Sequence, residues 1–192
     1  MLSRTSALVV VLLTVAACDS AREEGLDTEP APGCDDPGAA TVAVEPTATY
    51  LLTRDEDEAR SARAVPLADL GVEPGSRVRV ERLGEFQFRA RLDPDSVSYG
   101  VTAVFSTSRT LLDRDERERV PGALDAGDDY VTAPTLGEGA PTDIPEDFRV
   151  VDVETVDVPA EAAFLFVSPD DREFQDNLDE DDDFRLCFTP VE

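Results

Sequence analysis

AAFLFVSPDDREFQDNLDEDDDFRLCF, residues 162–188, holds two apolar segments on either side of an acidic one. FLFV at 164–167 is apolar at every position, which predicts a central strand that is covered on both faces. In FRLCF at 184–188 the apolar side chains alternate with arginine and cysteine, so a strand there turns Cys187 away from the core. Two strands joined by a polar loop predict a β-sheet protein whose acidic charge is densest in that loop.

Further segments upstream carry strand patterns. SRVRVERL at 76–83 and EFQFRARL at 85–92 alternate apolar and polar side chains with a period of two. VSYGVTAVF at 97–105 is rich in apolar and β-branched residues, which also favours a strand. In RVVDVETVDV at 149–158 the valines change phase, which predicts a bulge or turn near residues 154–155.

Turn residues separate these segments and limit helices. The stretch that could be helical, TLLDRDERERV at 110–120, alternates its charges in the way of a solvated surface segment. Seven or eight short strands separated by Pro- and Gly-rich turns predict an all-β fold, an antiparallel β-sandwich, over residues 41–192.

The N-terminus has the pattern of an export signal. Residues 7–15 are apolar over a length that is too short to span a bilayer but suits the core of a signal peptide. Val-Ala-Ala at 15–17 then precedes Cys18, which resembles the processing box of bacterial lipoproteins. The resemblance implies a signal peptide over 1–17, acylation of Cys18 and an extracytoplasmic protein anchored in the lipid bilayer of the bacterial cell envelope. A cleaved secretory signal with a chance cysteine is the alternative.

A tether and a disulfide are expected next. Residues 18–40 consist mostly of Glu, Asp, Pro, Gly and Ala, and such a segment cannot bury enough apolar surface to fold by itself. We therefore expect a lipidated, flexible acidic tether here. With Cys18 assigned to lipid, Cys34 and Cys187 form an even pair in a compartment where disulfides persist, and we predict that they are bonded.

The composition excludes several functions. The chain has 43 acidic residues against 17 arginines and carries a formal net charge of −26, so it repels nucleic acid and anionic lipid head groups. Cations are the expected partners, and solubility is the alternative explanation of the acidity. Histidine and tryptophan are absent, which removes the commonest acid-base group and the usual indole for stacking on sugars. Without a nucleophile or metalloprotease motif we expect no enzyme activity.

The acidic loop has the composition of a calcium site. Calcium takes six to eight oxygen ligands, and alternating carboxylates in a turn converge on one point. Asn177, Asp179 and Asp181 stand at positions one, three and five of such a loop, although Asp182 replaces the usual glycine and no glutamate closes it. A solvated acidic turn is the alternative. The predicted calcium ligands are Asp170, Asp171, Asp176, Asn177, Asp179, Asp181 and Asp183.

Two motifs resemble a known family. VPLADLGVEPGSRVRVERLGEFQF at 65–88, followed by FLFVSPDDREFQDN at 164–177, is similar to the galactophilic calcium-dependent bacterial lectins. The resemblance implies a galactose-binding-like jelly roll. It also implies calcium ligands at Asp170 or Asp171, at Asp176 and at Asn177, completed by backbone carbonyls of this loop and of the region after residue 88. The family's sugar site contains a histidine, which this chain lacks.

These observations predict a function. We expect a membrane-anchored module that binds calcium and, through the ion, a saccharide. The alternative is a structural envelope lipoprotein in which calcium only stiffens a loop and no sugar binds.

Overall fold

The described part of the chain is a β-sheet domain. The computed structural model describes residues 34–35, 37–53, 57–89, 93, 95–98, 100–126 and 144–191. Its contacts divide the chain into two units, Met1–Ala31 and Pro32–Glu192, and all described residues belong to the second. The expected signal peptide, Cys18 and most of the expected tether therefore lie outside the described residues. In the part that is described, no helix is long and apolar enough to cross a bilayer.

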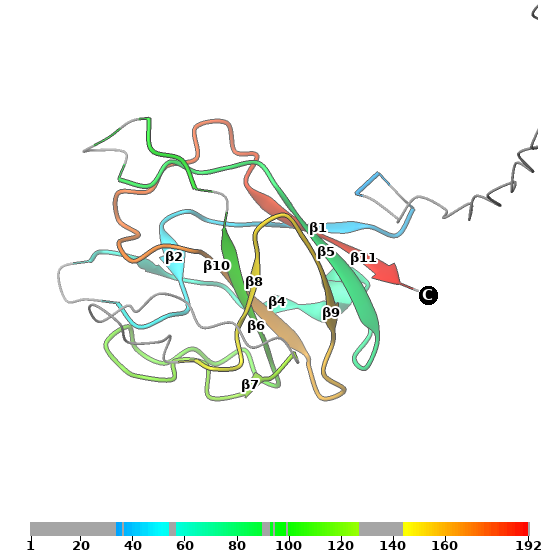
Figure 1. The fold of residues 1–192 in the computed structure, drawn as a ribbon. Helices are drawn as coiled ribbons and strands as arrows, with labels where there is room; N and C mark the ends of the chain where they lie inside the picture. The colour runs from blue at the N-terminus through cyan, green and yellow to red at the C-terminus, as the bar shows by residue number, and fades with distance from the viewer. Residues whose placement is uncertain are drawn as a thin grey trace, which may run out of the picture. The chain divides into compact units, whose positions relative to one another are not determined.

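The first sheet has four antiparallel strands in the order β1-β11-β5-β9 (Figure 1). They are β1 (Ala40–Ala43), β11 (Arg185–Val191), β5 (Arg77–Leu83) and β9 (Val153–Asp157). The first and last described strands, β1 and β11, are thus direct neighbours, in a register that places Thr41 opposite Cys187.

The second sheet has five antiparallel strands. The order is β4-β10-β6-β7, and β8 also pairs with β6. The strands are β4 (Val65–Pro66), β10 (Phe164–Pro169), β6 (Val101–Ser106), β7 (Ala123–Leu124) and β8 (Phe148–Val150). The prediction of a central strand in this region is confirmed, because β10 lies between β4 and β6.

Two smaller elements complete the described fold. The pair β2 (Ala48–Thr49) and β3 (Arg60–Ser61) is parallel and belongs to neither of the two antiparallel sheets. A 3-10 helix, η1 (Leu67–Leu70), follows β4 and ends at Gly71, whose backbone is left-handed with φ +62°.

Apolar side chains fill two clusters on the two sides of the second sheet. β10 contributes Leu165 and Val167 to the larger cluster, which contains Val78, Val80 and other inward residues of the first sheet. Phe166 points the other way, into a smaller cluster with Phe174 and others. This explains why β10 is apolar at successive positions. Two antiparallel sheets with an apolar cluster between them are consistent with the predicted sandwich.

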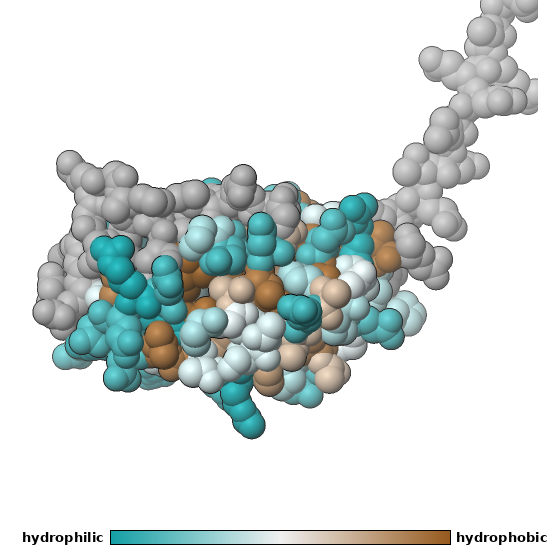
Figure 2. Space-filling model, turned by 90° about the horizontal axis from the view of Figure 1, so that it is seen from below, coloured by the Kyte–Doolittle hydropathy of each residue, from teal (hydrophilic) through white to brown (hydrophobic). Residues whose placement is uncertain are grey.

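The described surface carries few large apolar side chains. Figure 2 shows one face of the molecule, on which apolar residues lie scattered among hydrophilic ones. The exposed large apolar side chains of the described residues are Val151, Val153, Leu178 and Val191.

Two predicted features of the strands are wrong. The segment 85–92 does not form a strand in its described part, because the chain turns at Phe88 and Arg89, where φ of Arg89 is +56°. Only isolated bridges form there, from Phe86 to Ser98 and from Gln87 to Leu178. The break in the valine-rich segment falls at residues 151–152, before β9, and not at 154–155.

The segment 110–120 is not wholly a solvated surface. Arg119 is only 1% exposed, and its guanidinium donates hydrogen bonds to the carbonyl oxygens of Leu51 at 2.7 Å and of Thr49 at 3.2 Å. A buried arginine that satisfies backbone carbonyls ties this segment to β2.

Candidate metal centre

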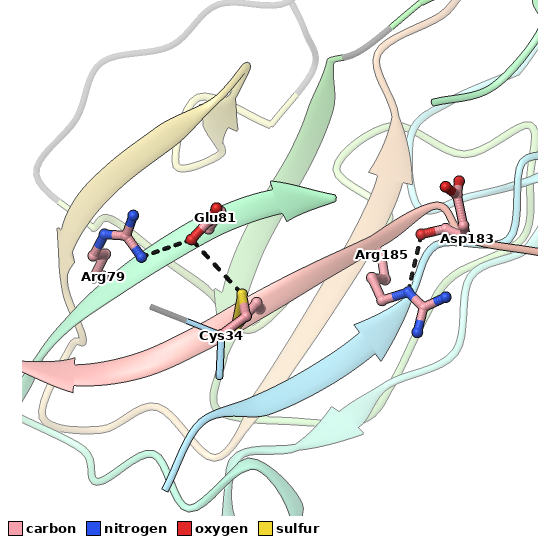
Figure 3. Close-up of a disulfide and its surroundings, with 6 residues drawn as sticks. Cys34, Arg79, Glu81, Asp183 and Arg185 are labelled. Atoms are coloured by element: carbon pink, nitrogen blue, oxygen red, sulfur yellow. Dashed lines mark hydrogen bonds and ion pairs between the residues drawn. A yellow bond between two sulfur atoms is a disulfide. The ribbon is translucent and has the colours of Figure 1, made fainter. Parts of the chain in front are cut away.

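The two cysteines of the folded part are bonded. Cys34 and Cys187 form a disulfide with a Cα–Cα distance of 5.9 Å, as the sequence predicts. Figure 3 shows it beside an ion pair on β5, where Arg79 Nη1 lies 2.7 Å from Glu81 Oε2. Because Leu186 and Phe188 point into the larger apolar cluster, Cys187 lies on the other face of the sheet, where it is fully buried and bonds to the chain that precedes β1.

The acidic loop connects β10 to β11 and lies beside the segment after β5 (Figure 1). Leu178 and Gln87 exchange two backbone hydrogen bonds, at 2.8 and 2.9 Å, which join the loop to that segment. At the start of the loop the Asp170 amide donates to the Gly100 carbonyl at 2.9 Å. The loop is therefore fixed to neighbouring backbone at its beginning and in its middle.

Asp170 pairs with an arginine. Its Oδ2 lies 2.6 Å from Nη2 of Arg149, and its side chain is 14% exposed. A Cβ atom at Gly100 would lie 2.8 Å from Asp170 and 3.2 Å from Arg149, so the ion pair needs a glycine beside it. Sequence reasoning offers Asp170 as a calcium ligand, whereas the structure neutralises it with Arg149.

Asp171, Asp176 and Asn177 form the first group of candidate ligands. Asn177 is 5% exposed, and its Nδ2 donates to the Pro46 carbonyl at 3.0 Å. The pKa of Asp171 is raised to about 6, mainly by burial and to a smaller extent by the charge of Asp176, against the opposing effect of hydrogen bonds from the backbone and from Asn177. Each of the three residues has a buried side-chain oxygen without a hydrogen-bond partner.

Asp179, Asp181 and Asp183 form the second group. One carboxylate oxygen from each lies within 4.8 Å of the other two, and among the described residues this is the convergent group of side chains that could hold a metal ion. Asp179 Oδ2 accepts a hydrogen bond from the Phe184 amide at 3.2 Å. Desolvation and the nearby charges of Asp183 and Asp179 raise the pKa of Asp181.

The backbone of this second group has a left-handed turn. Asp182 has φ +57°, at the position where a calcium-binding loop ordinarily uses glycine. Arg185 Nε donates to the Asp183 carbonyl at 2.9 Å (Figure 3), and Arg185 Nη2 donates to the Asp182 carbonyl. The turn is thus capped from the first residue of β11.

Gly84 allows the second group to approach the end of β5. A Cβ atom at this position would overlap the Asp183 carboxylate and would lie 2.6 Å from the Asp183 carbonyl carbon. The backbone at Gly84 is also left-handed, with φ +69°. Both facts restrict this position to glycine.

The donor set fits a hard divalent cation. Among the described residues of this loop, five side-chain oxygens are buried without a hydrogen-bond partner. These five oxygens belong to Asp171, Asp176, Asn177, Asp179 and Asp183. Buried oxygens without a donor destabilise a fold, and calcium or magnesium would satisfy them.

Sequence reasoning identifies the acidic residues of the loop but misses the residues that hold it. Asp57 is 1% exposed and accepts hydrogen bonds from the backbone amides of Phe174 and Gln175 at 3.0 and 3.1 Å. It lies 117 residues before Phe174 in the sequence. No local pattern marks either Asp57 or Arg149 as a neighbour of this loop. The region after Phe88 that the lectin resemblance implies for further ligands falls partly outside the described residues.

Comparisons of the chain with protein-family models, with curated proteins and with solved structures found no match. The resemblance to galactophilic lectins therefore rests on the sequence motifs alone. What the structure supports is an all-β protein with two antiparallel sheets, one disulfide and a candidate metal site in an acidic loop.

Proposed function

We propose that this protein is a calcium-binding module of the bacterial cell envelope, a β-sandwich held at a membrane through acylated Cys18. The observation that carries the calcium part is the set of five buried, unpartnered oxygens in the loop, together with the convergence of Asp179, Asp181 and Asp183. The signal-like N-terminus with Cys18 supports the membrane part.

Calcium fits the loop better than a transition metal does. The donors are carboxylate and amide oxygens, the chain has no histidine, and both cysteines of the domain are bonded to each other. Calcium accepts irregular oxygen shells, whereas magnesium demands a near-ideal octahedron. An exposed aspartate such as Asp181 is suited to an accessible extracellular site, for which the expected dissociation constant is about 0.1 to 1 mM.

Thermal unfolding of the full chain in detergent, after treatment with EDTA, tests calcium binding. At about 10 mM calcium, binding with that affinity stabilises the folded state by about 1.4 to 2.7 kcal/mol, which raises the Tm by several degrees. Asp181→Asn should reduce this calcium-dependent rise, and Asp69→Asn, an exposed aspartate outside the loop, should leave it unchanged. An equal Tm of the wild type in calcium and in EDTA would contradict the proposal.

Labelling of growing cells with radioactive palmitate tests the anchor. The wild-type chain should take up label and sediment with membranes, because two or more acyl chains hold a protein stably. Cys18→Ala should lose both properties. A wild-type chain that stays unlabelled would refute the lipid anchor and leave the calcium site untouched.

Carbohydrate is the proposed ligand of the bound ion. The motifs shared with galactophilic lectins support it, and the absence of the family's histidine argues that the sugar specificity differs. A glycan array probed in calcium and in EDTA separates this function from the structural alternative. Calcium-dependent signals would support a lectin, and silence in both would leave an envelope lipoprotein whose loop is stiffened by the ion.

A further inference from the structure

The backbone between Asp171 and Asp176 is held by a side chain from outside the acidic loop. Asp171 and Asp176 carry like charges on one short loop, and like charges near one another repel. The oxygens that would receive an ion stay buried without partners. Some other group must hold the backbone between these two aspartates.

Asp57 provides this support. Its Oδ2 accepts from the amide of Phe174 at 3.0 Å, and its Oδ1 accepts from the amide of Gln175 at 3.1 Å and from that of Ala59, also at 3.1 Å. Both carboxylate oxygens are therefore occupied by backbone donors. Hydrogen bonds to an ionised and buried carboxylate are among the stronger ones in proteins.

The position of these amides gives Asp57 its effect. Phe174 and Gln175 lie between Asp171 and Asp176, so the carboxylate of Asp57 fixes the backbone from which both candidate ligands project. Phe174 is itself fully buried in the smaller apolar cluster, which holds the same backbone from its other side. Asp57 contacts the loop through backbone amides and does not belong to the convergent acidic group.

We propose that Asp57 is a positioning residue, which holds the loop in its cation-binding shape before the ion arrives. This inference rests on the proposed calcium binding. A loop that is ordered in advance loses little conformational freedom when the ion binds, so the ion's affinity is higher. Residues that orient metal ligands without touching the metal contribute about 10- to 100-fold to affinity.

Calorimetric titration of the full chain with calcium tests the effect on affinity. Asp57→Asn should weaken calcium binding about 10-fold or more at unchanged stoichiometry, because the ligands remain but their backbone is held less firmly. Asp69→Asn, an exposed aspartate on η1, is the matched control and should bind as the wild type does. Equal affinities of Asp57→Asn and the wild type would overturn the inference, whereas absence of binding by the wild type would overturn the calcium proposal.

Hydrogen exchange of the wild type tests the inference without any substitution. If Asp57 orders the loop, the amides of Phe174 and Gln175 are protected from exchange in EDTA, and calcium changes their protection less than 3-fold. If they exchange freely in EDTA and become protected only with calcium, the ion and not Asp57 shapes the loop. This measurement decides the question even if Asp57→Asn fails to fold.

Discussion

The two halves of the acidic loop, residues 170–177 and 179–183, carry the same kind of side chain but are held differently. The first half is bound to three distant parts of the chain, through Arg149, Asp57 and Pro46. In the second half, the described hydrogen bonds run to its own backbone and to the beginning of β11. The fold therefore shapes the first half, while the second depends on whatever neutralises its converging carboxylates.

Removing the buried ring of Phe174, in the first half, should have the largest effect on the free energy of unfolding. Phe174→Ala deletes a fully buried aromatic side chain, which costs about 3 to 5 kcal/mol of unfolding free energy. Leu178→Ala, at a side chain 42% exposed between the two halves, is the control and should change stability by less than about 0.5 kcal/mol. Urea unfolding in EDTA measures both. Similar costs for the two variants would mean that the fold does not hold the first half.

Ionisation of Asp171, also in the first half, should have the second-largest effect on stability. The folded-state pKa is about 6, against an ordinary value of 3.8, so the ionised form of Asp171 lowers the free energy of unfolding by at most about 3 kcal/mol. Because this pKa is raised, the contribution of Asp171 to stability is complete below about pH 4 and is lost as the pH rises through 6. In EDTA, Asp171→Asn should therefore be more stable than the wild type at pH 7.5.

The difference in unfolding free energy between the wild type and Asp171→Asn should shrink as the pH falls to 4.5. Urea unfolding of both across this range measures it. If the difference in unfolding free energy between the wild type and Asp171→Asn did not vary with pH, ionisation of Asp171 would not destabilise the folded state. In calcium the difference at pH 7.5 should narrow, since the wild type then gains the ion's binding energy.

Two glycine variants test how closely Asp183, in the second half, packs against the end of β5. Gly71→Ala and Gly84→Ala both force alanine into a left-handed backbone, but open space surrounds the first position and the Asp183 backbone and carboxylate crowd the second. Gly84→Ala should thus cost at least about 1 kcal/mol more than Gly71→Ala, in urea unfolding with EDTA.

Calcium affinity should also differ between Gly71→Ala and Gly84→Ala. Only Gly84→Ala displaces Asp183, so only this variant should bind calcium more weakly than the wild type in a calorimetric titration. Equal calcium affinities in the two variants would remove Asp183 from the ligand set.

Sequence periodicity predicts the strands in which each face keeps the same kind of neighbour along the strand. β5 and β11 alternate inward and outward side chains, and β10 is apolar on both faces because it separates two apolar clusters. The disulfide between Cys34 and Cys187 is the pairing expected once Cys18 is assigned to lipid. In contrast, the period-two pattern at 85–92 fails, because the chain turns at Arg89 and leaves only isolated bridges.

The site is predictable in composition but not in geometry. The acidic residues are visible as a run, and Asp182 in a left-handed turn matches its place in the chelating pattern. The roles of Asp57, Arg149 and Gly84 depend on contacts between segments that are far apart in the chain. The ion pair between Asp170 and Arg149 likewise joins residues far apart in the chain, and only the folded arrangement reveals it.

The disulfide determines where mechanical load enters the domain. β1 is an edge strand, and tension applied at its start would unzip it from β11 one hydrogen bond at a time. The bond between Cys34 and Cys187 instead passes a pull from the N-terminal side directly to β11, an inner strand flanked by β1 and β5. Because β11 is held by two ladders of hydrogen bonds, the pull reaches a strand that is held more firmly than β1.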